Sequence, residues 1–210
     1  MECFPKIDVL IIGAGPAGLA AGSMLKKEGL IVQVIDNGES IDERQHHDHD
    51  ILGEGVGGSG LYSDGKFSFY PSASKLWKLE DKESLKTAYT WLRLLAQKYG
   101  LDMPDFPHHE EAVLCPSDCN TGGPISKTYK SIYGTLEMRL RLIGDLELEI
   151  GNMLLCKKHC IDIDHTSHPD TLWCTIESED GVKTKVAAKA VIFAGGRFGP
   201  LQLPEIITGV

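Results

Sequence analysis

The stretch Asp8-Val-Leu-Ile-Ile-Gly-Ala-Gly-Pro-Ala-Gly18 contains the spacing G-x-G-x-x-G, formed by Gly13, Gly15 and Gly18. Residues 9–12 before the first glycine are all apolar, which predicts a strand buried on both faces of a parallel sheet. The proline after the second glycine suits the first turn of a helix, because its φ is already helical and its missing N–H is not needed there. In such a turn the first glycine allows the tight bend, the second lets the backbone approach a pyrophosphate, and the third lets the helix pack on the strand. The stretch therefore predicts the phosphate-binding turn of a dinucleotide site.

A second apolar run, residues 30–35, ends at Asp36 and completes a strand–helix–strand unit. An acidic side chain at the tip of the second strand can accept hydrogen bonds from a ribose diol. The positive end of the helix and its N–H groups would face the phosphates of the same ligand. A glycine pattern alone is weak evidence, and a glycine-rich turn without a ligand is the alternative. The strand before it, the helix after it and the acid at the expected distance favour a dinucleotide site.

Composition and charge restrict the partners. The chain has 210 residues, enough for a full core, and a formal net charge of −9. This charge argues against nucleic acid or an anionic membrane as the main partner. No apolar run reaches the roughly 20 residues of a membrane span, and residues 1–6 lack the features of a secretory signal. We therefore expect a cytoplasmic protein whose six cysteines are reduced thiols.

Two groups of residues have the composition of metal ligands, but neither predicts a metal site. Cys115 and Cys119 are four residues apart, as are Cys156 and Cys160, and neither pair has C-x-x-C spacing. The second pair lies in an expected strand, in which residues four apart are too distant to share one ion without a bend. The segment His46-His-Asp-His-Asp50 is typical of an exposed polar loop. We expect no bound metal.

A second glycine-rich segment occupies residues 55–69. Within it, residues 60–66 read G-x-x-x-x-G-K, the pattern of a P-loop. Phe67 stands where that loop needs Ser or Thr to coordinate magnesium, and no apolar strand leads into the segment. We interpret it instead as a loop whose glycines let backbone N–H groups approach a ligand closely. Its polar contacts would be Ser59, Ser63, Asp64 and Lys66.

Periodicity over the rest of the chain predicts two helices followed by strands. Apolar residues at spacings of three and four predict a helix over 79–99 that ends at Gly100, and a second helix is expected over 128–143, ending at Gly144. Proline and glycine mark 101–125 as a loop. Strict alternation suggests a short strand over 146–150. Further strands are expected over 153–163, 171–177, 183–188 and 190–199, the last of which opens into glycines.

Together these segments resemble the flavoprotein superfamily that has the FAD fold of the glutathione-reductase type. The resemblance rests on residues 7–36, on the antiparallel strands of 153–188 and on the strand 191–196, which stands for the usual apolar-Ala-Thr-Gly segment. Gly195 occupies the threonine position there, so the family's hydroxyl is missing. Residues 57–66 are similar to the G-G-x-G-x-x-S-D-G-K segment of a poorly characterised family of FAD-dependent dehydrogenases.

The resemblance implies FAD as the cofactor, with its pyrophosphate on residues 13–18, its ribose on Asp36 and the loop 57–66 near the flavin. The cofactor-binding residues that it implies are Gly13, Ala14, Gly15, Pro16, Ala17, Gly18, Asp36, Asn37, Gly57, Gly58, Ser59, Ser63, Asp64, Gly65, Lys66, Ala194, Gly195 and Gly196. No catalytic residue is identified, because flavin itself carries the redox chemistry. Lys66 is a weak candidate, since a cation near flavin N1 would favour the anionic reduced form; a phosphate contact or a solvated side chain is the commoner role.

The expected architecture is an α/β, Rossmann-like FAD/NAD(P)-binding domain with a parallel sheet, an antiparallel β-meander and a helical insertion. Residues 1–45 and 146–199 would form this domain, residues 46–145 the flavin-side loop and the insertion, and residues 200–210 a tail. Complete enzymes of this type continue well past Gly199. The resemblance therefore implies a C-terminally truncated chain, or one that needs a partner chain or an oligomer to complete the fold.

We expect an FAD-binding oxidoreductase, or the cofactor-binding part of one, that transfers a hydride or electrons to or from an unidentified small molecule. NAD(P)H is the expected electron donor. Two alternatives stay open: an NAD-dependent dehydrogenase, because FAD and NAD share the same ADP half, and a non-catalytic flavin-binding module. The strands of 153–188 and the loop 57–66 favour FAD over NAD, and Asp36 would repel the 2′-phosphate of NADP. The loop has no cysteine, which excludes a disulfide reductase.

Overall fold

A computed structural model describes residues 5–44, 52–68, 79–106, 131–167, 170–197 and 206–208. The chain divides into two compact units. The first comprises Met1–Ser63 and Ile143–Val210, and the second comprises Asp64–Leu142. The predicted phosphate-binding turn, Asp36 and residues 194–196 therefore all belong to the first unit.

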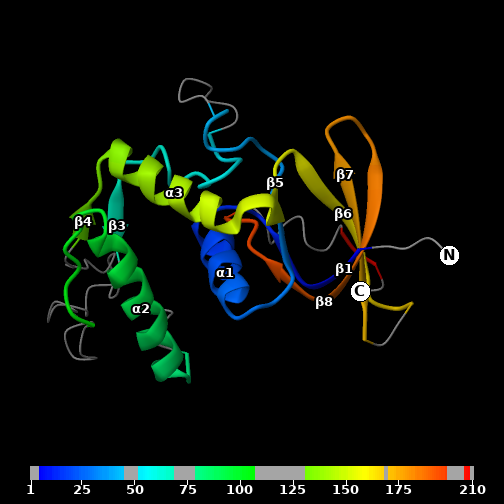
Figure 1. The fold of residues 1–210 in the computed structure, drawn as a ribbon, viewed down its shortest axis with the longest axis horizontal. Coiled ribbons are helices and arrows are strands. Elements are labelled where there is room, and N and C mark those ends of the chain that lie inside the picture. The colour runs from blue at the N-terminus through cyan, green and yellow to red at the C-terminus, as the bar shows by residue number, and fades with distance from the viewer. Residues whose placement is uncertain are drawn as a thin grey trace, which may run out of the picture. The chain divides into compact units, whose positions relative to one another are not determined.

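A sheet of seven strands, counted over the described residues, forms the frame of the first unit (Figure 1). In chain order the strands are β1 (Lys6–Ile12), β2 (Val32–Ile35), β5 (Leu154–Leu155), β6 (Lys158–Asp164), β7 (Leu172–Ser178), β8 (Lys183–Phe193) and β9 (Ile207–Thr208). Their order across the sheet is β5-β2-β1-β8-β7-β6-β9. Strands β5, β2, β1 and β8 pair in parallel, whereas β8, β7 and β6 form an antiparallel meander. The predicted combination of a parallel sheet with a β-meander is confirmed.

Strand β8 belongs to both parts of the sheet. Residues 183–188 pair with β7, and residues 187–193 pair with β1, so that Phe193 lies beside Ile12. The two separate strands expected over 183–188 and 190–199 are therefore one continuous strand. No glycine or proline interrupts residues 183–193, and the extended backbone passes from one partner strand to the next without a turn. This register places residue 194 directly beside the end of β1.

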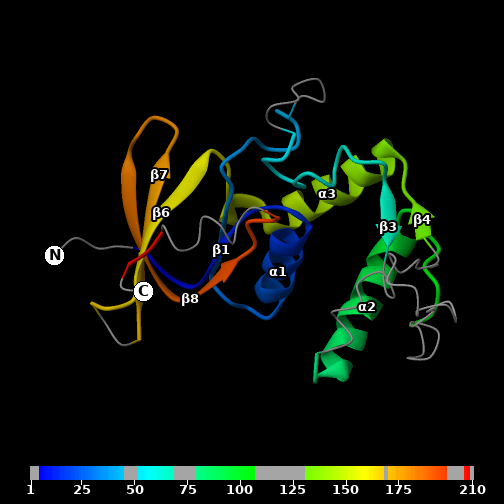
Figure 2. The same cartoon turned by 180° about the vertical axis from the view of Figure 1, so that it is seen from behind.

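Helix α1 (Pro16–Lys27) connects β1 to β2 and packs beside them (Figure 2). Leu10 and Ile11 of β1 are fully buried, and they face opposite sides of the sheet because side chains alternate along a strand. Ile11 lies under α1, where its side chain is close to Gly18. Leu10 packs on the other side in a cluster with the apolar residues of the meander. The predicted strand buried on both faces is therefore confirmed.

Helix α3 (Leu136–Ile150) ends against α1 in the first unit. The Nζ atom of Lys26 donates hydrogen bonds to the carbonyls of Glu149 at 2.6 Å and Ile150 at 3.1 Å. A cation at this position stabilises the helix, because the last carbonyls have no partners within it. A 3-10 helix (Gly151–Met153) then leads into β5.

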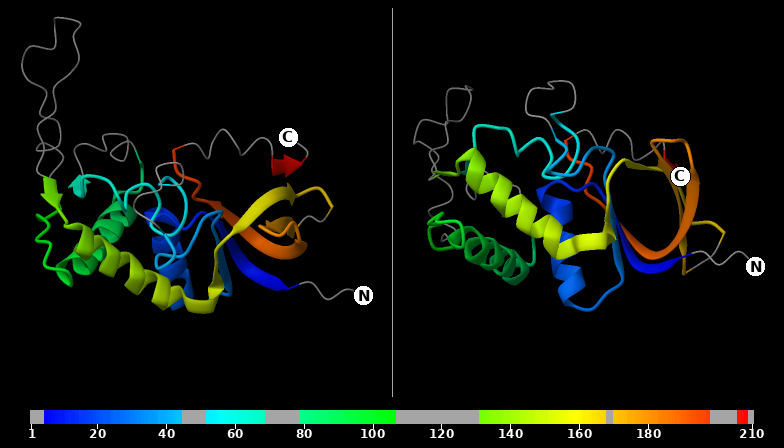
Figure 3. Two further views of the ribbon diagram at one scale, coloured as in Figure 1. Left: turned by 90° about the horizontal axis from the view of Figure 1, so that it is seen from above. Right: turned by 45° about the horizontal axis from the view of Figure 1, so that its top comes forward.

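The second unit contains strand β3 (Lys66–Ser68), which pairs antiparallel with β4 (Ser131–Tyr133), and helix α2 (Lys82–Gln97) beside them (Figure 3). Asp81 caps α2, because its Oδ1 accepts a hydrogen bond from Ser84 N at 2.9 Å. The apolar core of this unit consists of Tyr89, Ala96, Leu101 and Met103, with Phe67, Leu92, Phe106, Ile132 and Met138 packed against it. The helix predicted over 79–99 is confirmed.

The predictions of a helix over 128–143 and a strand over 146–150 are wrong in three ways. Residues 131–133 form strand β4, because they pair with β3, and the helix begins only at Leu136. The helix does not end at Gly144, and residues 146–150 continue it instead of forming a strand. Leu146 and Ile150 are buried four residues apart, whereas Leu148 is 79% exposed. The first and last apolar residues of this short alternating segment are four apart, so they also lie on one face of a helix. A Cβ on Gly144 would meet nothing within 4 Å, so this glycine occupies an open helical position.

Among the residues that the structure describes, no helix has the length and apolar character needed to cross a membrane.

Candidate cofactor site

The turn between β1 and α1 needs two of its glycines for folding alone. Gly13 has a φ of +105°, and a Cβ there would lie 2.5 Å from the carbonyl oxygen of Ala194. A Cβ on Gly18 would lie 1.8 Å from the carbonyl oxygen of Gly13, because α1 packs closely on the turn. Both distances are far inside van der Waals contact. These two glycines are required by the protein whether or not a ligand binds.

Gly15 is different, because the protein leaves space around it. A Cβ there would find its nearest neighbour, the Cα of Gly58, 4.0 Å away. Gly15 is the N-cap of α1, no side chain caps the helix at this end, and its first turn contains no acidic residue. Pro16 follows as the first helical residue. The open space therefore lies at the positive end of a helix, which fits a phosphate group.

Asp36 connects three loops through its carboxylate. Its Oδ2 accepts a hydrogen bond from Ala14 N at 2.6 Å, and its Oδ1 accepts from Gly38 N at 3.0 Å and Gly55 N at 2.8 Å. A carboxylate offers about four acceptor positions, so about one, on Oδ2, is left for a ligand. The predicted contact of Asp36 with ribose stays a prediction. The structure adds a second role, the ordering of the loops around the site.

Residues 55–58 lie against the phosphate-binding turn. The N–H of Gly57 donates to the carbonyl of Ala14 at 2.8 Å. A Cβ on Gly58 would lie 3.3 Å from the Cα of Gly15. Gly57 and Gly58, predicted from sequence, are therefore brought next to residues 13–15.

The end of β8 reaches the turn from the other side. Ala194 N donates to the carbonyl of Ile12 at 2.8 Å. Gly195 and Gly196 follow, and Gly196 has a φ of +68°. Residues 194–196, the turn, Asp36 and residues 57–58 therefore converge at the carboxyl ends of the parallel strands, where open α/β sheets bind their ligands.

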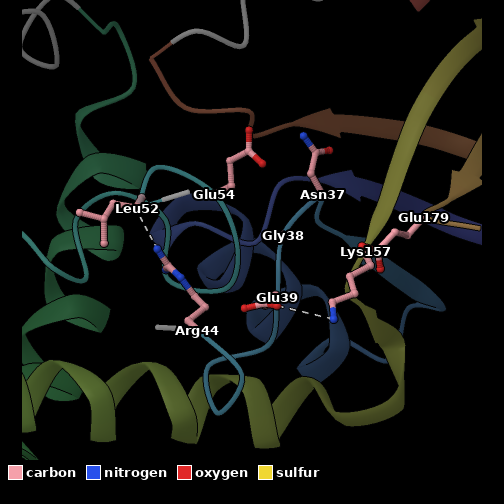
Figure 4. Close-up of a pocket in the computed structure, with 8 residues that line it drawn as sticks. All are labelled: Asn37, Gly38, Glu39, Arg44, Leu52, Glu54, Lys157 and Glu179. Atoms are coloured by element: carbon pink, nitrogen blue, oxygen red, sulfur yellow. Dashed lines mark hydrogen bonds and ion pairs between the residues drawn. The ribbon is translucent and has the colours of Figure 1, made fainter. Parts of the chain in front are cut away.

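A cavity of about 180 Å³ lies beside this point, at the end of β2 (Figure 4). Residues of the first unit line it: Asn37, Gly38, Glu39, Arg44, Leu52, Glu54, Lys157 and Glu179. Lys157 joins β5 to β6 with a φ of +55°, and its N–H donates to the carbonyl of Gly38 at 2.9 Å. This break replaces the single strand predicted over 153–163.

The polar side chains of the cavity are themselves oriented. Asn37 Oδ1 lies 2.9 Å from Nδ1 of His159, which donates because an amide oxygen only accepts. The amide nitrogen of Asn37 points away, on the side of Glu54 (Figure 4). Lys157 Nζ lies 3.7 Å from carboxylate oxygens of both Glu39 and Glu43. Glu43 and then Glu39 raise the pKa of Lys157, so this side chain is a cation at neutral pH.

The remaining predicted residues lie in the loop 59–66, and all of them but the buried Gly65 are exposed. Ser59 and Ser63 lie at the surface of the first unit, and Ser63 Oγ donates to the carbonyl of Gly60 at 2.8 Å. Asp64, Gly65 and Lys66 belong to the second unit. The main-chain N–H of Lys66 donates to Asp64 Oδ1 at 3.1 Å, and Lys66 begins β3. A strand rather than a helix follows this lysine, so the segment lacks the geometry of a P-loop.

Three cysteines of the first unit are described, all as free thiols. Burial raises the pKa of Cys156 and Cys160 to about 11 and that of Cys174 to about 12. They are therefore protonated at neutral pH, whereas metal ligands and nucleophiles need the thiolate. Within the described ranges, no group of three His, Cys, Asp or Glu side chains is placed to hold a metal ion. Residues 46–50 and the pair at 115 and 119 lie outside these ranges.

Of the residues that line the cavity, only Asn37 was predicted from sequence, and the two cations Arg44 and Lys157 were missed. Arg44 is a single arginine in a polar segment, and no periodicity marks it as buried. Nothing in the sequence indicated the left-handed backbone of Lys157, because glycine and asparagine are the residues that usually adopt this conformation. The pattern of the other lining residues also gave no sign that they share a cavity, since they come from the segment after β2 and from the turn after β7.

Comparisons with known proteins agree with this geometry. Residues 6–45 match the sequence model of a family described as FAD binding domain. The flavin-containing monooxygenase FMO GS-OX-like 9 of Arabidopsis thaliana is 29% identical over 147 residues, which are 67% of this chain and 29% of that protein. A structure of RebC soaked with K252c is 15% identical with a TM-score of 0.52, covering 97% of this chain and 35% of that chain. A structure of the rebeccamycin biosynthetic enzyme RebC with reduced flavin is 14% identical with a TM-score of 0.50. The match covers 96% of this chain and 35% of that chain.

The solved structures show that the fold is shared, and the family match identifies the cofactor. The matched segment contains the phosphate-binding turn and Asp36. FAD is therefore the cofactor of the first unit, and the open space at Gly15 beside a polar cavity fits its diphosphate and adenosine. The chain spans less than a third of the length of the curated relative it matches.

Proposed function

We propose that this chain is the FAD-binding part of a flavin-dependent oxidoreductase, and that its first unit holds the ADP half of the cofactor. The observation that carries the proposal is the open space at Gly15. It lies at an uncapped helix N-terminus, within the segment that matches an FAD-binding family. A turn that served only the fold would need Gly13 and Gly18 but not a third glycine.

Each part of the site has a proposed task. The N-terminus of α1 binds the diphosphate through backbone N–H groups and the helix dipole. Asp36 accepts a ribose hydroxyl at its remaining acceptor position, and Asn37 presents its amide N–H groups to the cavity that receives the adenosine. Residues 194–196 and 57–58 border the diphosphate on either side. The contacts predicted for Ser59, Ser63, Asp64, Gly65 and Lys66 stay predictions.

Bound FAD supplies a ring that accepts and returns a hydride or electrons. The protein needs to bind and orient it and to exclude water. The curated relative is named a flavin-containing monooxygenase, which supports a redox role for the flavin. A small-molecule substrate and NAD(P)H as the electron donor stay predictions from sequence. A partner chain or oligomer and the cytoplasmic location remain predictions from sequence, and the sequence does not identify the substrate.

The test uses the purified 210-residue chain and its visible spectrum. We expect it to take up FAD, with shifted flavin bands near 450 nm and quenched fluorescence. ADP should displace FAD, because both would occupy the α1 N-terminus and the cavity, whereas FMN should not. A chain that binds NAD but not FAD would overturn the proposal in favour of an NAD site.

A second measurement addresses the reaction. Anaerobic NADH or NADPH should bleach the bound flavin if the chain retains the electron-donor step. A chain that binds FAD tightly but is reduced by neither nucleotide, while dithionite reduces it fully, would instead support the non-catalytic flavin-binding module.

A further inference from the structure

Arg44 is a buried cation in the first unit, only 9% exposed. Its guanidinium donates to three main-chain carbonyls: Nη1 to Val56 at 2.7 Å and Gly58 at 3.1 Å, and Nη2 to Leu52 at 2.9 Å. All three carbonyls belong to residues 52–58. A guanidinium presents its N–H groups in a rigid planar fork, so one side chain fixes three points of this segment at once.

No acidic side chain in the described part of the chain lies within ion-pair distance of this guanidinium. Its Cζ lies 5.0 Å from the centre of the Tyr62 ring, and the Tyr62 hydroxyl donates to the carbonyl of Arg44 at 3.4 Å. Burial lowers the pKa of Arg44, although the guanidinium stays charged at neutral pH. Burying a charge on carbonyl dipoles is costly. A buried guanidinium hydrogen-bonded to carbonyls is expected where the position of the bonded segment, here residues 52–58, matters for function.

The segment that Arg44 holds borders both parts of the candidate site. Leu52 and Glu54 line the cavity, as Arg44 itself does (Figure 4). At the other end, Gly57 N donates to the carbonyl of Ala14 in the phosphate-binding turn. Loss of the fork would therefore release one wall of the cavity together with the segment that lies against the turn.

We propose that Arg44 is a positioning residue for the ADP half of the cofactor. It holds residues 52–58 in place before FAD binds, and it does so through the hydrogen bonds of its fork rather than through its charge. The inference rests on the proposed function for the identity of the ligand, whereas the clamp on residues 52–58 is a property of the chain alone.

Two substitutions separate the fork from the charge. Arg44→Met keeps much of the volume and removes both, and Arg44→Lys keeps the charge but cannot reach three carbonyls. Lys183→Met is the matched control, because it removes an exposed cation of β8 that pairs with Glu177. Amide hydrogen exchange is measured on the full 210-residue chain without cofactor, and the affinities for FAD and ADP are measured by titration.

We expect both Arg44 variants to accelerate exchange at the amides of Val56, Gly57 and Gly58 by about tenfold or more. The amides of β1 should remain protected, and the affinities for FAD and ADP should fall by about the same factor. Lys183→Met should change neither quantity. Should Arg44→Met fail to fold, Arg44→Lys carries both measurements, since lysine keeps the charge and most of the length.

Three results would overturn the inference. Wild-type exchange and FAD affinity in Arg44→Lys would mean that the charge alone is needed. A uniform loss of protection through β1 and β8 would mean a general effect on stability. Accelerated exchange with unchanged ADP affinity would mean that the clamp does not serve the cofactor. A wild-type chain that binds neither FAD nor ADP would overturn the proposed function itself, and the exchange data would still report on the clamp.

Discussion

The two glycine-rich segments of this chain are held in place by different means. Residues 13–18 span the turn after β1 and the first residues of α1, where the φ of Gly13 and the close packing of Gly18 fix the turn. Residues 52–58 have no helix or strand of their own, and the side chains of Asp36 and Arg44 hold them by hydrogen bonds. A sequence motif identifies the first kind of loop, because its glycine spacing follows from main-chain geometry. A motif does not identify the second kind of loop, because the side chains that anchor it lie elsewhere in the sequence.

The largest effect on stability is expected from Gly18→Ala. The new Cβ would lie 1.8 Å from the carbonyl oxygen of Gly13, which is backbone and cannot move aside cheaply. We expect a loss of about 3 kcal/mol or more in the free energy of unfolding, measured by urea denaturation. Retention of wild-type stability would mean that α1 does not pack on the turn as described.

Gly144→Ala is the matched control for this substitution. A Cβ there would meet nothing within 4 Å, and the residue lies inside α3. Alanine is the better helix former, so the free energy of unfolding should rise by about 0.5–1 kcal/mol. A destabilised variant would instead favour a helix that ends at this glycine, as expected from the sequence.

A smaller loss of stability is expected from Asp36→Asn, which tests how side chains hold residues 52–58 in place. Asparagine has one acceptor oxygen, so at least one of the N–H groups of Ala14, Gly38 and Gly55 loses its partner. The loss should be about 1–3 kcal/mol, with weaker FAD binding. The control is Asp180→Asn in an exposed turn, where Asp180 Oδ1 accepts a hydrogen bond from Val182 N at 3.3 Å. For this variant we expect the free energy of unfolding to change by no more than about 0.5 kcal/mol. Equal effects at both positions would argue against Asp36 as an organiser of the site.

A further effect is expected at alkaline pH, and it concerns the meander rather than the loops. Burial raises the pKa of Cys160 to about 11 and that of Cys174 to about 12. As pH rises above about 8.5, thiols in the unfolded chain lose protons that the folded chain keeps, so the free energy of unfolding falls.

This pH dependence is measured from urea midpoints at pH 7.5, 9 and 10.5. Cys174→Val keeps an apolar side chain of similar volume and should fall less steeply with pH than the wild type. Parallel pH profiles for the two chains would contradict a buried, protonated Cys174.

The strand–helix–strand unit could be predicted from sequence because its signals are local. Residues 9–12, the three glycines and Asp36 each have a fixed place relative to the turn, and the structure places them accordingly. The meander was predictable for the same reason, since the short turn at Asp180 and Gly181 marks it. Where periodicity was ambiguous the prediction failed: residues 146–150 satisfy both a strand and a helical face.

The rest of the site depends on contacts between distant residues. Asp36 meets Gly55 across 19 positions of sequence, and Arg44 meets Gly58 across 14. Lys157 adopts a left-handed backbone because Gly38 and two glutamates hold it there. No propensity or spacing encodes these partners, so the cavity and its clamp could only be found in three dimensions.

Gly15→Ala shows whether the open space at Gly15 is reserved for a ligand. The backbone of Gly15 is extended, with a φ of −68°, and the nearest atom to a Cβ there is 4.0 Å away. Urea denaturation and FAD titration are performed on the same variant. We expect a free energy of unfolding within about 0.5 kcal/mol of wild type and an FAD affinity at least about tenfold weaker. Unchanged FAD affinity in a stable variant would contradict the placement of the diphosphate.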